Sequence, residues 1–157
     1  MKRYLFTVIL FVVCAVSNAQ SLTFEELLNL TGMTDEQANY FLTVSKGFKS
    51  TGLQVLNGKN EYQYKSNSSA PGKTETVTID VSTNNTGAKT LRVVTYNTLQ
   101  EQDINNLLAE AKKSSLTIVF QGSDANKNIY RFDNSLFRAS ISLSIDKKYG
   151  SVEVQQR

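Results

Sequence analysis

The side chains in this sequence that could perform acid–base chemistry are carboxylates grouped in short runs. Glu25-Glu26, Asp35-Glu36, and Glu101 with Asp103 each place two acids close together. Two neighbouring carboxylates can act as general acid and general base in a hydrolytic reaction. Each pair here falls in the first turn of an expected helix, where acidic side chains stabilise the helix dipole. We therefore assign these carboxylates to helix starts rather than to catalysis.

The residue types that carry most other hydrolytic and metal chemistry are absent or rare. The 157 residues include no His and a single Cys. A Ser-His-Asp triad, a Cys-His dyad and an imidazole metal site are therefore excluded. One Cys can form neither an internal disulfide nor a thiolate cage. The sequence thus predicts a protein that is not an enzyme and that uses no cofactor or metal.

One acidic segment resembles the start of a calcium-binding loop. Asp124, Asn126 and Asn128 would supply oxygen ligands at the first, third and fifth positions of an EF-hand pattern. The Gly expected at the sixth position is Ile129, and the Glu expected at the twelfth is Ser135. Asp and Asn are also common in hairpin turns, so we expect a turn between two strands here.

The first 19 residues have the pattern of a secretory signal peptide. Lys2 and Arg3 precede an apolar run at 5–16, and the small residues of 17–19 predict cleavage before Gln20. The apolar run is shorter than the about 20 residues that span a bilayer, so no membrane span is expected after cleavage. We therefore expect a secreted or periplasmic protein.

Cleavage would leave residues 20–157 as the mature chain. Cys14 would leave with the signal, and the bulky Val13 before it argues against a lipoprotein anchor. The mature chain would carry 15 basic and 14 acidic residues, because Lys2 and Arg3 leave as well. A net charge this close to zero gives no electrostatic reason to expect nucleic acid or an anionic membrane as partner.

Residues 20–157 are predicted to form a single domain with two similar halves, about 23–97 and about 98–157. A capping box is expected to begin each of three helices. These boxes pair Thr23 with Glu26, Thr34 with Gln37, and Thr98 with Glu101. The apolar spacing of the second helix returns 66 residues later in the third. Ala38, Phe41, Leu42 and Ser45 correspond in this way to Ile104, Leu107, Leu108 and Ala111.

Eight segments rich in β-branched and aromatic residues predict strands. They cover residues 48–55, 61–65, 76–81, 91–96, 116–120, 128–134, 137–145 and 151–155. The pattern of residues 60–66 returns 68 residues later at 128–134. We therefore predict an α+β fold in which two tandem α-β-β-β-β repeats form an antiparallel sheet of up to eight strands, with the helices packed on one face.

This order of elements resembles the β-lactamase-inhibitor-protein family over about residues 23–155. That family also has two tandem repeats of a helix followed by four strands. The resemblance implies a concave sheet that grips a partner protein. Members of the family carry a disulfide in each repeat, whereas residues 20–157 contain no Cys. The chain also looks like many small secreted proteins of gram-negative bacteria.

Aromatic side chains are expected mostly in the core. The predicted core aromatics are Phe24, Phe41, Phe48, Tyr62, Tyr64, Phe120, Tyr130, Phe132 and Phe137. In segment 91–96, Leu91 and Val93 occupy one face of the strand, and Arg92, Val94 and Tyr96 occupy the other. If Leu91 and Val93 face the helices, the second set lies on the open face of the sheet, where Val119, Arg131 and Arg138 would join it.

Tyr and Arg are enriched at protein-binding hot spots. The predicted partner-binding residues are therefore Arg92, Val94, Tyr96, Val119, Arg131 and Arg138. The other register of segment 91–96, or an added segment over the sheet, would cover these side chains instead. A large loss of stability in a Tyr96→Ala variant would reveal that Tyr96 belongs to the core.

The sequence therefore predicts a non-catalytic protein that recognises another protein through its open sheet face. A structural or envelope-associated module is an alternative, which self-association would favour. A carrier of a small molecule or lipid is the other alternative, and it requires an enclosed apolar cavity between the helices and the sheet.

Overall fold

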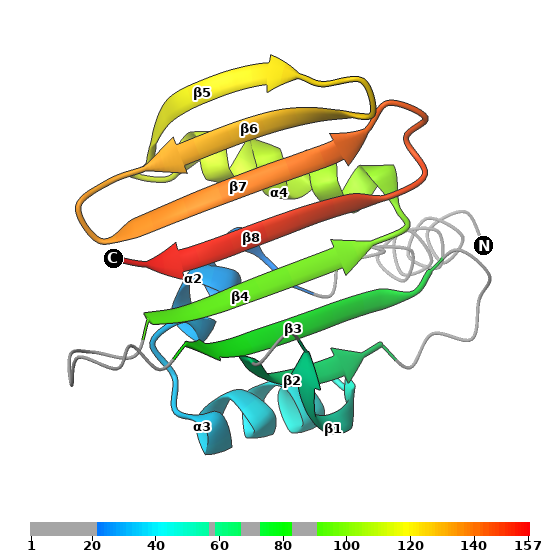
Figure 1. Ribbon diagram of the computed structural model, residues 1–157, viewed down its shortest axis with the longest axis vertical. Coiled ribbons are helices and arrows are strands. Elements are labelled where there is room, and N and C mark those ends of the chain that lie inside the picture. The colour runs from blue at the N-terminus through cyan, green and yellow to red at the C-terminus, as the bar shows by residue number, and fades with distance from the viewer. Residues whose placement is uncertain (1–21, 57–58, 67–72, 83–90) are drawn as a thin grey trace, which may run out of the picture.

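The computed structural model describes residues 22–56, 59–66, 73–82 and 91–157. Within them, eight strands form one open antiparallel sheet in the order β1-β2-β3-β4-β8-β7-β6-β5 (Figure 1). The fold is α+β, as predicted. The predicted export signal at residues 1–19 lies outside the described residues.

The strands agree with the predicted segments to within a few residues. They are β1 Lys49–Leu56, β2 Lys59–Lys65, β3 Glu75–Ser82, β4 Leu91–Thr98, β5 Thr117–Ser123, β6 Lys127–Asp133, β7 Phe137–Ser144 and β8 Gly150–Gln156. Strands β1 to β4 pair in chain order, and so do β5 to β8. The two four-stranded halves join where β4 pairs antiparallel with β8. The last strand of each half therefore lies at the centre of the sheet.

Helices cover one face of this sheet. They are α2 Phe24–Leu30, α3 Asp35–Tyr40 with the π-helical turn η1 Phe41–Ser45 directly after it, and α4 Glu101–Lys113. In Figure 1, α2 and α4 lie behind the strands, so the view looks onto the open face. Both helices contact β4 and β8. The helix layer therefore spans the junction between the two halves.

Two of the three predicted capping boxes are present. The Thr23 hydroxyl accepts a hydrogen bond from the Glu26 N–H at 3.2 Å, and the Glu26 carboxylate accepts one from the Thr23 N–H at 2.9 Å. Thr34 and Gln37 form the same reciprocal pair at the start of α3. These contacts satisfy amide groups that a helix leaves unpaired at its first turn.

The third capping box, Thr98 with Glu101, is a wrong prediction. The N-cap of α4 is Gln100, whose N–H is bonded to the Thr98 hydroxyl at 3.1 Å. Thr98 in turn donates to the carboxylate of Asp103 at 3.1 Å. Burial raises the pKa of Asp103, and the hydrogen bond from Thr98 opposes this rise. The side chain that organises this helix start is therefore Asp103, not Glu101.

The core lies between the helices and the covered face of the sheet. Val94 of β4 pairs with Ile79 of β3 and with Val154 of β8. All three side chains are buried, and they meet the apolar faces of the helices. Leu27 of α2 and Leu107 of α4 are completely buried in the same cluster.

The predicted exposure of Val94 and Tyr96 is therefore wrong. Both side chains have 0% exposure, because β4 presents the face with Val94 and Tyr96 to the helices. Tyr96 lies between Val77 of β3 and Val152 of β8, which continue an apolar row across the junction. The open face of β4 instead carries Val93 and residues such as Thr95, both partly exposed.

A β-bulge interrupts each outer strand. The register of β1 with β2 shifts between Ser50 and Gly52, and the register of β5 with β6 shifts between Ile118 and Phe120. The two bulges are 68 residues apart, the same spacing that relates 60–66 to 128–134. Gly52 has a φ of 88°, which is open to Gly but strained for other residues.

The bulge in β5 also corrects the prediction that Phe120 belongs to the core. Unbroken alternation from the buried Leu116 would turn Ile118 and Phe120 toward the helices. The extra residue at Val119 reverses the faces beyond it, since a bulge sets two residues opposite one. Phe120 therefore shares the face of its register partner Arg131 and is 45% exposed.

Candidate functional site

Three of the six predicted binding residues meet in one hollow on the open face. Val119 of β5, Arg131 of β6 and Arg138 of β7 line a depression of about 450 Å³. Glu153 and Gln155 of β8 complete its opposite wall. Strand alternation predicts the faces of Arg131 and Arg138 correctly, because apolar residues such as Phe132 and Ala139 mark the covered faces of β6 and β7.

The other three predicted residues belong to the covered face. Val94 and Tyr96 are core residues, and Arg92 lies on the same side of β4. The Arg92 guanidinium forms an ion pair with Asp35 at the start of α3. This ion pair links α3 to β4, and Arg92 is not part of the open face.

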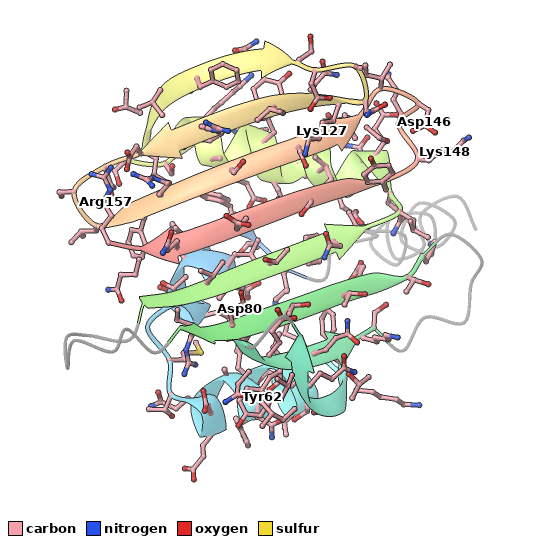
Figure 2. All side chains as sticks on the ribbon, in the orientation of Figure 1. Tyr62, Asp80, Lys127, Asp146, Lys148 and Arg157 are labelled. Atoms are coloured by element: carbon pink, nitrogen blue, oxygen red, sulfur yellow. The ribbon has the colours of Figure 1, made fainter. Side chains whose placement is uncertain are left out.

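A second, smaller hollow adjoins the first. Lys127, Ser142, Tyr149 and Ser151 line a depression of about 290 Å³. Both depressions share Arg131, Ser140 and Glu153, so they form one continuous groove across β6, β7 and β8. We call it the open-face groove. In Figure 2, Lys127 lies at one end of these strands and Arg157 at the other.

One transverse row of side chains passes through the middle of the open-face groove. The strand register sets Arg131 opposite Ser140, and Ser140 opposite Glu153. The row continues through the junction into the first half of the sheet. In order from β5 to β1 its residues are Phe120, Arg131, Ser140, Glu153, Thr95, Thr78, Gln63 and Gly52.

The row explains why a hollow exists at Ser140. Two strand spacings separate Arg131 from Glu153, or about 10 Å between their backbones. The short Ser140 side chain between them leaves space that longer residues would fill. The backbones of Arg131 and Glu153 therefore lie on either side of a floor that carries the Ser140 hydroxyl.

Arg131 is held in place by an aromatic ring. Its guanidinium carbon lies 5.4 Å from the centre of the Phe120 ring, within the range of a cation–π contact. No described carboxylate forms an ion pair with Arg131. Its charge and its planar set of donors are therefore available to a bound group. Holding the guanidinium in advance reduces the entropy that binding would cost.

Arg138 is only partly neutralised. Its Nε lies 4.0 Å from a carboxylate oxygen of Asp133, and the same oxygen lies 2.6 Å from Nη2 of Arg157. The shorter contact makes Arg157 the main partner of Asp133, and the Arg138 side chain remains 59% exposed. The residues that line the open-face groove include the cations Lys127, Arg131 and Arg138 and the anions Asp133 and Glu153, so the lining has a surplus of one positive charge.

The corresponding positions of the first half are uncharged. Gln63 takes the place of Arg131, Thr78 that of Ser140, and Thr95 that of Glu153 in the same row. Acidic side chains lie nearby instead, since Glu61 and Asp80 are opposite each other in β2 and β3. Within this row, the arrangement of an arginine and a glutamate on either side of a serine therefore occurs only in the second half.

The segment that resembles a calcium loop is a hydrogen-bonded turn. The Asp124 carboxylate accepts the N–H groups of Asn126 and Lys127 at 2.8 and 2.9 Å. These backbone hydrogen bonds lower the pKa of Asp124, because they favour its charged form. Among the described residues, no cluster of three or more His, Cys, Asp or Glu side chains could hold a metal ion.

Most other residues of the open-face groove and its border are not predicted as site residues by the sequence, and among them Phe120 and Glu153 contribute most to its chemistry. Phe120 could not be identified because nothing in residues 117–123 shows the bulge. The position of Glu153 on the open face is predictable, because this charged residue lies between Val152 and Val154 in an alternating strand.

Comparisons of the chain with protein-family models, with curated proteins and with solved structures found no match. The described helices include none with the length and apolar character needed to cross a membrane.

Proposed function

We propose that this protein is a secreted or periplasmic binding protein that captures another protein in the open-face groove and catalyses no reaction. The observation that carries the proposal is Arg131, which has no ion-pair partner among the described residues and stacks on an exposed Phe120. Arg and aromatic residues next to a well-shaped hollow are typical of binding hot spots. The export pattern at residues 1–19 supports the location.

The mixture of groups in the groove favours a protein over a small apolar ligand. Val119 and Phe120 give an apolar border, Ser140, Ser142 and Ser151 give hydroxyls, and charges of both signs flank them. Protein interfaces combine apolar contacts, hydrogen-bonding groups and charges, whereas pockets for small apolar ligands are lined mainly by apolar side chains.

We also propose that the two halves arose by duplication and that the second half became the binding half. The matching bulges and the 68-residue spacing support this origin. The replacement of Gln63, Thr78 and Thr95 by Arg131, Ser140 and Glu153 at matching places supports the specialisation. The resemblance to β-lactamase-inhibitor proteins, which also grip a protein on a sheet, agrees with such a role.

A site-specific cross-linking experiment tests the proposed function. A photoreactive phenylalanine analogue replaces Tyr149, which borders the groove, or Tyr40, which lies on α3 and is 64% exposed. The full chain is expressed in its native host and irradiated. We expect a discrete adduct with a second protein from position 149 and none from position 40. Arg131→Gln should reduce the adduct at least fivefold, and Gln63→Ala should leave it unchanged.

Other patterns would contradict the proposal. An adduct of twice the mass of the chain would favour a self-assembling structural module. Equal adducts from both positions, or an adduct that Arg131→Gln does not weaken, would show that the open-face groove is not the binding surface.

A further inference from the structure

Strand β5 is a sheet edge that is open to pairing. Among the described strands its only neighbour is β6. An edge strand leaves every second N–H and C=O group without a partner strand, and proteins usually protect it with charges or proline. Thr117–Ser123 contains neither a charged residue nor Pro, and Ile118, Val119 and Phe120 are 42%, 59% and 45% exposed.

The bulge at Val119 would disturb regular hydrogen bonding between β5 and an added strand at that position only. From Phe120 to Ser123, β5 stays in regular register with β6. The opposite edge of the sheet differs, because β1 begins with Lys49 and has a positive φ at Gly52, where its register with β2 shifts. Figure 1 shows β1 turning away from the common strand direction, whereas β5 runs alongside β6.

The cation of the open-face groove reaches toward this edge. Arg131 belongs to β6, but its guanidinium lies over the Phe120 ring of β5. A strand added beside β5 would lie about 4.8 Å from it. Every second side chain of that strand would project on the open face, next to Phe120. A carboxylate there could form the bidentate pair that a guanidinium favours.

We propose that the partner binds as an extended segment that adds a strand along β5 and places a carboxylate against Arg131. The inference rests on the proposed function and specifies the chemistry of the partner. Pairing with β5 would supply affinity through main-chain hydrogen bonds, and the Arg131 contact would supply selectivity for an acidic segment.

The same observations argue against a second copy of this chain as the occupant. Paired β5 strands from two copies would bring the uncharged Thr117–Ser123 against itself. No carboxylate would then meet Arg131 from either strand. An acidic segment of a different protein could form main-chain hydrogen bonds with β5 and also an ion pair with Arg131.

Synthetic peptides test the inference with the full mature chain. The acidic peptide is a ten-residue chain in which Thr and Val alternate with Glu. The first control replaces each Glu by Lys, and the second has Pro at two central positions. Binding is followed by NMR titration, and the exchange rates of the β5 amide protons are measured with and without peptide.

We expect the acidic peptide to bind at least tenfold more tightly than either control and to slow amide exchange in Phe120–Ser123. Arg131→Gln should weaken this binding at least fivefold. Gln63→Ala, the variant at the matching place in the first half, should change it less than twofold.

Three results would overturn the inference. The first is equal binding of the acidic and basic peptides, or no binding of either. The second is protection of β5 that grows with protein concentration in the absence of peptide, because a second copy would then occupy the edge. The third is binding that shifts Ser140 and Ser151 but leaves β5 exchange unchanged. This last result would reject strand addition while the open-face groove stays a binding surface, so it differs from failure of the cross-linking experiment.

Discussion

At the scale of single residues, the face on which a side chain lies determines whether it contributes to stability or to binding. Tyr96 and Thr95 are neighbours in β4, but Tyr96 is completely buried and Thr95 lies on the open face. Arg92 and Arg131 differ in the same way. Arg92 is paired with Asp35 beside the helices, whereas Arg131 lies over an exposed ring.

Tyr96→Ala should lower the free energy of unfolding by about 3–5 kcal/mol, because it removes a large side chain from the core. Thr95→Ala, one residue away on the open face, should change it by about 0.5 kcal/mol or less. Urea unfolding followed by circular dichroism measures both. Equal unfolding midpoints for the two variants would show that Tyr96 is not a core residue.

At the scale of elements, sequence patterns predict structure well where the deciding contacts are local. The capping boxes of Thr23 and Thr34 join residues only three positions apart, so a short stretch of sequence is enough to predict them. The covered face of β4 depends on Ile79 and Val154, which belong to other strands. Segment 91–96 alone has apolar residues on both faces and cannot decide between them.

In the candidate site too, features set by local sequence are predictable, and features set by pairing with another strand are not. The sequence predicts Arg131 and Arg138 on the open face because apolar and polar residues alternate clearly in β6 and β7. The sequence predicts Phe120 in the core because regular alternation along β5 does not include the bulge. The bulge is a property of the pairing between β5 and β6, and only the register reveals it.

The packing of α4 on β8 gives a prediction at this scale. A Cβ at Gly150 would lie 2.2 Å from Cγ1 of the buried Ile104. Gly150→Ala should therefore destabilise the protein by about 1–3 kcal/mol, since the helix must shift away from the sheet. Gly32→Ala is the matched control, because its nearest neighbour would be 3.7 Å away.

Unfolding of the two glycine variants in guanidinium chloride measures this difference. An Ile104→Ala variant should reduce the cost of Gly150→Ala, because it removes the atoms that clash. A Gly150→Ala midpoint equal to that of Gly32→Ala would mean that α4 does not approach β8 so closely.

At the scale of the whole molecule, the two halves contact each other in both the sheet and the helix layer. The sheet is continuous through the pairing of β4 with β8. In the helix layer, α2 belongs to the first half but contacts β8, and α4 begins the second half but contacts β4. Neither half can unfold without exposing apolar surface of the other.

We therefore expect a single cooperative unfolding transition. The calorimetric and van't Hoff enthalpies should agree, and near- and far-ultraviolet circular dichroism should give the same midpoint. Two resolved transitions would show that the halves are independent folding units.

The junction between β4 and β8 also has a symmetry. Thr95 is opposite Glu153, and the transverse row through this pair ends at Gly52 in β1 and at Phe120 in β5, the residues that follow the two bulges. A two-fold axis through this pair would exchange β1 to β4 with β5 to β8 in order and direction, as in a sheet shared by the two subunits of a homodimer. In a true homodimer every substitution appears twice. Within one chain that constraint is absent, so Glu153 can carry a charge on one side of the axis while Thr95 on the other side is neutral.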